Sequence, residues 1–192
     1  MRSGKYARST VTMAREANPS ALGSFGIELL LSLLLFVLPA HAATAPPIKI
    51  AVFDFELEDV SAAGTATSGD TAKEATRMQA VTTEARRVLA QSGRYRIVDT
   101  SGAEAEVAKD KPLRNCNGCE AGIALKLGAE RSLIGVVTRV AQTEYYVSVR
   151  IMDTATSQVV KQESAFFTGA DDAWASGAAM LLKHQVLAEP SH

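Results

Sequence analysis

Residues Ile48–Leu57 read IKIAVFDFEL, and the prediction of the fold starts from this stretch. It is rich in β-branched and aromatic residues, and its apolar residues are nearly continuous as far as Phe53. Such a run is typical of a strand that is buried on both faces, because other elements must cover both sides of it. The sequence therefore predicts a central strand in a covered sheet.

The residues that follow predict a helix and a second strand. Apolar residues recur at helical spacing from Ala75 through Val81 and Ala85 to Leu89. Residues Arg94–Thr100, RYRIVDT, then have the composition of a short strand. Together the three segments predict a βαβ unit, in which the two strands run parallel and the crossover is right-handed.

The rest of the chain predicts a second helix, three consecutive strands and a last helix, at residues 117–127, 132–140, 144–153, 158–167 and 171–187. Gly128 follows the second helix as its C-cap. Apolar and polar residues alternate in 144–153, as in a strand with one wet face. The order β-α-β-α-β-β-β-α predicts an α/β (α+β) fold: a mixed sheet with a parallel βαβ half and an antiparallel meander, and helices packed on the sheet.

An apolar run near the N-terminus predicts export. Residues 29–42 read LLLSLLLFVLPAHA, and the basic residues before this run are Arg2, Lys5, Arg8 and Arg15. About ten apolar residues suit the core of a signal peptide but fall short of the ~20 that a membrane-spanning helix needs. We therefore expect a signal peptide at 1–42 that is cleaved after Ala42. Met13 is an alternative start.

Cleavage there leaves about 150 residues, the usual size of one domain. We expect a flexible start at 43–47, a single globular domain at 48–188 and a tail at 189–192. Residues 43–192 contain 16 Lys and Arg against 19 Asp and Glu, a net charge of −3. This mild charge indicates neither nucleic acid nor an anionic membrane surface as partner, and no membrane span is expected after the leader.

Cys116 and Cys119 are the only cysteines, in a C-x-x-C motif. In an exported chain this motif predicts a disulfide. The alternative is a redox pair, since Cys119 lies at the start of the second predicted helix, where the helix dipole stabilises a thiolate. Covalent haem requires a histidine where Glu120 stands, and zinc would have only His184 and His192 as further ligands. We therefore predict no metal and no cofactor.

Four acidic residues at the end of the first predicted strand suggest a ligand or cation site: Asp54, Glu56, Glu58 and Asp59. Asp54, Glu56 and Glu58 are expected to share a face, because side chains two residues apart in a strand point the same way. Cations and polar ligands often bind beyond the carboxyl ends of parallel strands. The alternative is that these carboxylates are solvated or paired with arginine or lysine.

Aromatic and arginine side chains of the predicted meander suggest a protein interface on one antiparallel face: Arg139, Tyr145, Tyr146 and Arg150. Residues of these types are frequent among the energetically dominant contacts of protein interfaces. An exposed edge strand of the meander is also able to accept a strand of a partner. The alternative is a half-buried face with ordinary cross-strand pairs.

Five segments together resemble a family of small secreted proteobacterial proteins known only as a domain of unknown function. They are IAVFDFELEDVS (50–61), SGRYRIVD (92–99), CNGCEAGIALKLGAERSLIGVVTRV (116–140), YYVSVRIMDTATSQVV (145–160) and DDAWASGAAMLL (171–182). More distantly, the element order and the segment LGAERSLIGVV are similar to the N-terminal domain of the Tol-Pal protein TolB and to the periplasmic domain of the curli secretion lipoprotein. The resemblance implies a shared architecture, and it brings no catalytic residues.

The chain has no nucleophile paired with a base and no cofactor loop, so no catalytic residue is predicted. We expect a non-enzymatic accessory or binding protein of an envelope or periplasmic complex, whose partner is a periplasmic protein or a small ligand. The alternative is a thiol-disulfide or redox accessory factor that uses Cys116 and Cys119. The sequence leaves the oligomeric state open.

Overall fold

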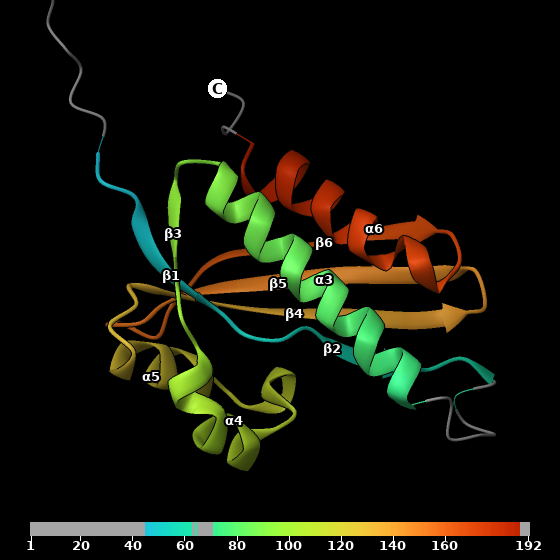
Figure 1. Cartoon of the computed structure of the whole chain (residues 1–192), viewed down its shortest axis with the longest axis horizontal. Coiled ribbons are helices and arrows are strands. Elements are labelled where there is room, and N and C mark those ends of the chain that lie inside the picture. The colour runs from blue at the N-terminus through green and yellow to red at the C-terminus, as the bar shows by residue number, and fades with distance from the viewer. Residues whose placement is uncertain (1–44, 63, 65–70, 189–192) are drawn as a thin grey trace, which may run out of the picture. The chain divides into compact units, whose positions relative to one another are not determined.

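The structure is a computed structural model, and it describes residues 45–62, 64 and 71–188. The strands of this part are β1 (Ile48–Val52), β2 (Glu56–Asp59), β3 (Tyr95–Val98), β4 (Arg131–Ala141), β5 (Glu144–Asp153) and β6 (Val159–Thr168). They form one mixed sheet in the order β3-β1-β4-β5-β6, and β2 pairs with β4 (Figure 1). The predicted signal peptide and tail lie outside the described residues. None of the described helices is long and apolar enough to cross a membrane.

The parallel half of the sheet is the predicted βαβ unit. The helix α3 (Thr71–Gln91) leads from the first part of the chain to β3, which pairs in parallel with β1, with Ile48 opposite Tyr95. Val81, Ala85 and Leu89 of α3 are buried. The apolar stripe that predicts this helix is therefore the face that lies on the sheet.

The strands β4, β5 and β6 form the predicted antiparallel meander. Their register places Val147 opposite both Val137 and Ala165. Along β5 the residues of one face are buried and most of those of the other are more exposed. This alternation is the one that the sequence predicts for a strand with one wet face.

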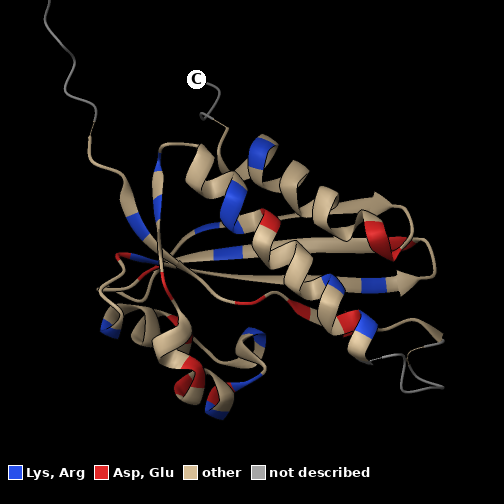
Figure 2. Cartoon of the chain, in the orientation of Figure 1, with Lys and Arg blue, Asp and Glu red and all other residues tan. Residues whose placement is uncertain are grey.

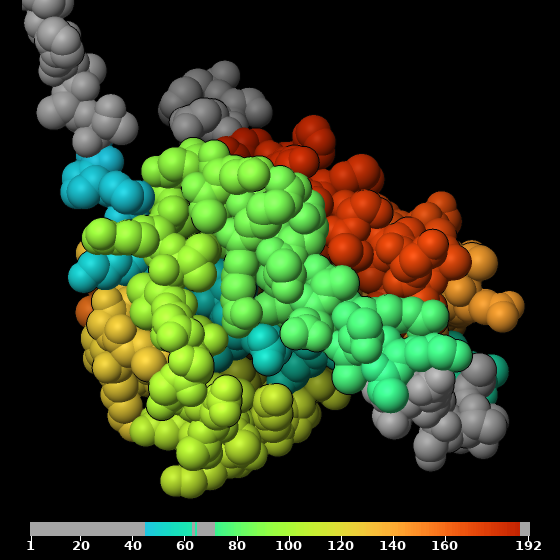
Figure 3. All heavy atoms as spheres, in the orientation of Figure 1, coloured from blue at the N-terminus to red at the C-terminus, as the bar shows by residue number. Residues whose placement is uncertain are grey.

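One face of the sheet is covered by α3 and by the C-terminal segment, whose atoms pack side by side in Figure 3. The last predicted helix, 171–187, is present as three successive helical segments of different type. They are the 3-10 turn η3 (Asp171–Ala173), the α-helix α6 (Trp174–Leu181) and the π-helical turn η4 (Leu182–Val186).

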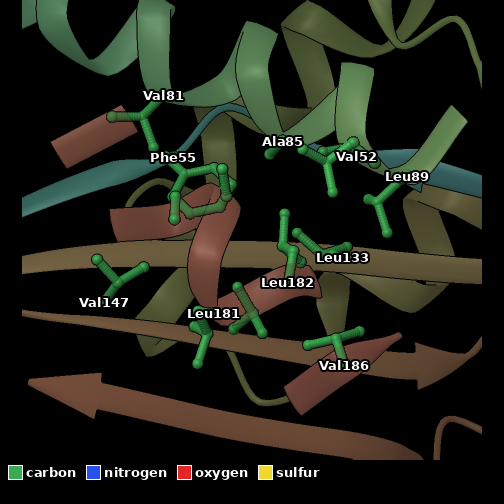
Figure 4. Packing of buried hydrophobic residues seen from close by; sticks show 14 of the residues in the cluster. Val52, Phe55, Val81, Ala85, Leu89, Leu133, Val147, Leu181, Leu182 and Val186 are labelled. Atoms are coloured by element: carbon green, nitrogen blue, oxygen red, sulfur yellow. The ribbon is translucent and has the colours of Figure 1, made fainter. Parts of the chain in front are cut away.

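The larger hydrophobic cluster lies between these helices and the sheet. Figure 4 shows Phe55 beside Val81 and Ala85 of α3, and Leu133 of β4 beside Leu182. Burying one such side chain contributes roughly 1.5–3 kcal/mol relative to leaving it in water. The cluster is therefore the main attachment of both helices to the sheet.

The opposite face carries a shorter helical layer. Its elements are η1 (Ser101–Ala103), α4 (Glu104–Asp110), η2 (Leu113–Asn115) and α5 (Cys119–Lys126). Ile123 and Ala124 of α5 pack with Phe53 and Ile134 in a second, smaller cluster. Gly128 follows α5 with a φ of 75°, which fits the predicted C-cap.

The first strand is interrupted, so the expectation of one continuous strand over 48–57 is corrected. Val52 is opposite Leu133, whereas Glu56 is opposite Val136. The chain thus advances four residues where β4 advances three. One extra residue on one strand is a β-bulge, and it separates β1 from β2.

A buried hydrogen bond holds the bulge against α3. The backbone N–H of Phe55 donates to Thr82 Oγ1 at 2.9 Å, and the Thr82 hydroxyl donates to the carbonyl oxygen of Met78, also at 2.9 Å. Thr82 is buried. The hydroxyl therefore supplies the acceptor that the Phe55 N–H lacks where the strand leaves the ladder.

The extra residue reverses the side of the sheet that each later side chain faces. Ile50 and Val52 before the bulge belong to the larger cluster, and Phe55 and Leu57 after it also pack there. Strict alternation from Val52 would instead have directed Glu56 into this core. The bulge keeps apolar residues in the core on both sides of the break.

The packing of Phe55 predicts the effect of adding one methyl group at Gly135 of β4. A Cβ at Gly135 would overlap the Phe55 ring. Gly135→Ala should therefore lower the free energy of unfolding by about 1–3 kcal/mol, as overpacking does. Urea unfolding followed by circular dichroism measures the change. The control is Gly122→Ala in α5, where a Cβ meets no atom and alanine favours the helix, so it should be neutral or stabilising. Equal losses in both variants would contradict this packing.

Candidate functional site

Of the four carboxylates of the predicted cation site, the structure brings only Glu56 and Glu58 to a shared partner, Arg114. Asp54 lies in the bulge, is mostly exposed, and accepts a hydrogen bond from Arg86 Nη2 at 3.2 Å. Glu56 accepts from the backbone N–H of Leu113 at 2.6 Å and from Arg114 Nη1 at 3.0 Å. Asp54 and Glu56 therefore bind different segments of the chain.

Glu58 lies beside the same arginine as Glu56, whereas Asp59 binds a different one. Glu58 accepts from Thr138 Oγ1 at 3.2 Å and lies 3.8 Å from Arg114 Nε. Asp59 accepts from Arg139 Nη1 at 2.7 Å. The shared face expected for Asp54, Glu56 and Glu58 is corrected, because the bulge breaks the alternation between the first and the second of them. Each of the four carboxylates has an arginine beside it, as in the ion-paired alternative.

Arg139, near the end of β4, is the centre of a cluster of ion pairs. Its Nη1 lies 2.7 Å from Asp59 and 3.1 Å from Glu74, and its Nη2 lies 3.2 Å from Asp171. The guanidinium also lies over the ring of Trp174, 4.8 Å from the centroid, where a cation–π attraction operates. Figure 2 shows acidic and basic segments of α3 and β4 close to one another at this end of the sheet. The cluster ties the first turns of both covering helices to the sheet.

Strand register and the starts of two helices bring these groups together. Asp59 is directly opposite Arg139 in the pairing of β2 with β4. Glu74 lies in the first turn of α3 and Asp171 in η3, immediately before α6. Acids at helix starts are favourable there in their own right, because they complement the helix dipole. Arg77 adds a second cation on Asp171 at 2.7 Å.

The cluster shifts the proton equilibria of its members. Burial acts to raise the pKa of Asp59, but hydrogen bonds from the side chain and backbone of Ser61 and the charge of Arg139 together hold it below its ordinary value. Burial acts to lower the pKa of Arg139, and the charge of Asp171 with hydrogen bonds to Glu74 and Asp59 raises it overall. Both groups are therefore ionised at neutral pH, and the cluster acts as a structural clamp.

The residues of the predicted interface divide between the two faces of the sheet, so the expectation of one shared face is corrected. Arg139 and Tyr145 are opposite each other on the face that α3 and α6 cover. Tyr145 is only 2% exposed, and its hydroxyl donates to the carbonyl oxygen of Ala173 at 2.9 Å. Tyr146 and Arg150 belong to the other face, because neighbours alternate along β5.

Tyr146 forms an exposed aromatic pair with Phe166. The two residues are opposite each other on β5 and β6, and their rings are edge to face with centroids 5.1 Å apart. Tyr146 is 45% exposed and Phe166 48%. Val159 and Val160, at the start of β6, are exposed to a similar extent. We call Tyr146 and Phe166 the β5–β6 surface. Within the described chain, no strand pairs with the outer edge of β6.

Cys116 and Cys119 form a disulfide, as the sequence predicts. Glu120, the next residue, is fully buried, and Arg150 Nη2 lies 2.6 Å from its Oε1. Sequence reasoning missed this pair, because an acid in the first turn of a helix is usually solvated. The signal was Arg150, a lone cation in the middle of a strand that is otherwise mostly apolar.

The two sulfurs and the Glu120 carboxylate lie within 4.8 Å of one another. In the part of the chain that the structure describes, this is the one group of three or more potential metal ligands so close together. Both sulfurs are used in the bond between Cys116 and Cys119, so neither is a thiolate ligand in this state.

A hollow of about 280 Å³ lies beyond the carboxyl ends of β1 and β3, where parallel sheets often bind ligands. Its polar lining includes Asp54, Arg86, Asp99, Thr100 and Lys111. Arg86 is fixed by donating to the carbonyl oxygen of Val52 at 2.7 Å. Of the four residues of the predicted cation site, only Asp54 borders the hollow. The other lining residues come from segments that no sequence pattern grouped with it. A lining with both signs of charge suits a small polar molecule.

A family model and several solved structures match the chain. The family model DUF3280, described as a protein of unknown function (DUF2380), matches residues 48–186. This span includes every described element from β1 to η4. A comparison with curated proteins gives no match.

The similar solved structures share little sequence with the chain. The C-terminal domain of LpoB from Escherichia coli is 16% identical with a TM-score of 0.45, and the match covers 73% of this chain and 94% of that one. The PelC dodecamer from Paraburkholderia phytofirmans is 18% identical with a TM-score of 0.42, and the match covers 73% of this chain and 85% of that one. TolB from Acinetobacter baumannii is 15% identical with a TM-score of 0.40, and the match covers 75% of this chain but only 30% of that one. Values this low say nothing about activity or partner.

The Arg139 cluster predicts unequal effects for two arginines of β4. Arg139→Met leaves three partly buried carboxylates beside one another, so it should lower the free energy of unfolding by about 3 kcal/mol. The control is Arg131→Met, which removes a single pair with Asp153 and should cost no more than about 1 kcal/mol. Urea unfolding at neutral pH measures both. Similar losses would show that the cluster does not act as a clamp.

Asp59 predicts a stability difference that depends on pH. Its pKa is below the ordinary value of 3.8 in the folded chain, so its contribution is present above that value and is lost as the pH falls through the folded pKa. Ser61→Ala removes the hydroxyl that donates to Asp59 at 2.6 Å. The variant should be less stable than the wild type at neutral pH, and the gap should narrow as the pH falls below the ordinary value of 3.8. Urea unfolding at neutral pH and at a series of lower pH values tests this, and a gap independent of pH would contradict it.

Proposed function

The chain belongs to DUF3280, a family of unknown function, and we propose that it is an exported accessory protein that acts by binding a protein partner in the periplasm or cell envelope. Export is supported by the apolar run at 29–42 with its basic flank, and we place the cleavage after Ala42, ahead of the domain at 48–188. A protein of this kind needs no catalytic residues.

The observation that carries the proposal is the exposed aromatic pair of Tyr146 and Phe166. Aromatic rings left half exposed and fixed against each other keep much apolar surface in contact with water. Such rings lose little conformational freedom on binding and are frequent at the centres of protein interfaces. The pair therefore marks the side of the sheet that a partner covers.

The neighbouring edge indicates how a partner binds. Among the described residues, β6 is the last strand of the sheet, with ten residues and no strand on its outer side. Its free backbone N–H and C=O groups are a template for another strand. We propose that an extended segment of the partner pairs with β6 and places apolar side chains against Phe166 and Tyr146.

A double variant tests the β5–β6 surface. Tyr146→Ser with Phe166→Ser removes both rings from exposed positions, so folding should be little affected while binding is lost by at least about tenfold. The control is Met180→Ser on α6, which removes a side chain exposed to a similar 50% away from this surface. Chemical cross-linking in the periplasm, followed by quantitative mass spectrometry of the captured proteins, measures binding.

The proposal predicts one identified protein that is cross-linked to the wild type and to Met180→Ser, and is lost with the double variant. Cross-links to a second copy of this chain, lost in the same way, would replace the partner with self-association. Capture that does not differ among the three proteins would overturn the proposal. Circular dichroism and urea unfolding confirm that each variant is folded.

A further inference from the structure

The disulfide is placed beside a buried carboxylate. Cys119 is the first residue of α5, and Glu120 follows it with none of its surface exposed. Cys116 and Cys119 are themselves only partly buried. The pair therefore lies between the surface of the protein and the carboxylate of Glu120.

The two oxygens of Glu120 have different surroundings. Oε1 accepts hydrogen bonds from Arg150 Nη2 at 2.6 Å and Arg150 Nε at 3.1 Å. Oε2 lies 3.4 Å from Cys116 Sγ, and among the described residues it has no other contact within hydrogen-bond range. A sulfur in a disulfide carries no hydrogen to donate. In the oxidised state this buried oxygen therefore lacks a donor, which is costly.

Reduction of the bond would supply the missing donor. A thiol on Cys116 is in position to donate to Oε2, and a hydrogen bond to a charged acceptor is among the stronger ones in proteins. Cys119 would instead remain at the N-terminus of α5, where the unpaired backbone N–H groups stabilise a thiolate. The surroundings of both sulfurs thus favour the reduced pair, each in a different form.

From this geometry we propose that Cys116 and Cys119 form a reactive disulfide that exchanges with the thiols of other molecules while the protein stays folded, and that Glu120 is a positioning residue for Cys116. The proposal goes beyond binding at the β5–β6 surface and is independent of it. The substrates are cysteine thiols, in a protein or in a small molecule such as glutathione.

The exchange proceeds in two displacements that conserve atoms and electrons. A thiolate attacks Cys116 Sγ, the S–S bond breaks, and its electron pair leaves on Cys119 as the thiolate. A second thiolate then attacks the external sulfur of the mixed disulfide, and the electron pair returns to Cys116, which takes up a proton and donates to Glu120. Two external thiols are oxidised to one disulfide, the protein pair is reduced by two electrons, and the second proton goes to water.

Equilibration with glutathione tests the proposal. The purified protein is incubated in a series of reduced and oxidised glutathione without denaturant, its free thiols are alkylated, and mass spectrometry gives the fraction reduced. The wild type should be reduced by glutathione while its circular dichroism spectrum stays that of the folded chain. Glu120→Gln removes the charged acceptor, so the equilibrium constant for reduction should fall by about tenfold. The matched control is Glu106→Gln, which neutralises an exposed carboxylate paired with Lys126 and should leave the constant unchanged.

A second pair of variants keeps the test valid if Glu120→Gln does not fold. The variants are Cys116→Ser with Cys119→Ala, and Cys116→Ala with Cys119→Ala. The serine hydroxyl imitates the thiol and donates to Oε2, so this variant should unfold at a higher urea concentration than the alanine variant. Two results would overturn the proposal: a disulfide that glutathione reduces only when the chain unfolds, or equal values for Glu120→Gln and Glu106→Gln. Where Glu120→Gln is unfolded, equal stabilities of the serine and alanine variants overturn it instead.

Discussion

The hydrogen bond from the backbone of Phe55 to the hydroxyl of Thr82 holds the bulge on which the centre of the sheet depends. One extra residue there exchanges the two faces for everything that follows in β2. As a result Leu57 joins the core beneath α3, Asp59 lies beside Arg139, and Glu56 is free to bind the segment that leads to α5. Neighbouring residues of β2 thus contact the helical layers on opposite sides of the sheet, with Leu57 and Asp59 on one side and Glu56 on the other.

The sequence predicts the elements better than it predicts the site, and the reason is physical. Helical spacing from Ala75 to Leu89 and alternation from Glu144 to Asp153 are local patterns, and both elements are where these patterns place them. The bulge leaves no trace in composition, because Phe53 and Phe55 are both apolar yet belong to different clusters. A prediction that assumes strict alternation of side chains across the bulge therefore assigns the later residues to the wrong face of the sheet.

The side-chain clusters depend on distances along the chain that no local pattern reports. Arg139 and Glu120 each have the ordinary appearance of a surface charge in the sequence, and only the register of β4 and β5 reveals their partners. Arg150, four residues after Tyr146 on the same face of β5, lies about 13 Å along the strand from the exposed aromatic pair. The β5–β6 surface is thus the part of this face that α5 and its disulfide leave uncovered.

The Arg139 cluster also depends on the last part of the chain, which supplies Asp171 and Trp174. Asp59 lies 80 residues before Arg139, and Asp171 lies 32 residues after it. During synthesis, Asp171 and Trp174 become available to the guanidinium only when almost the entire domain has been made. A product that ends before them leaves Arg139 without its aromatic face and with one carboxylate fewer. The contacts of Arg139 are therefore complete only when the last part of the domain is present, which favours folding of the whole domain over folding of its first part alone.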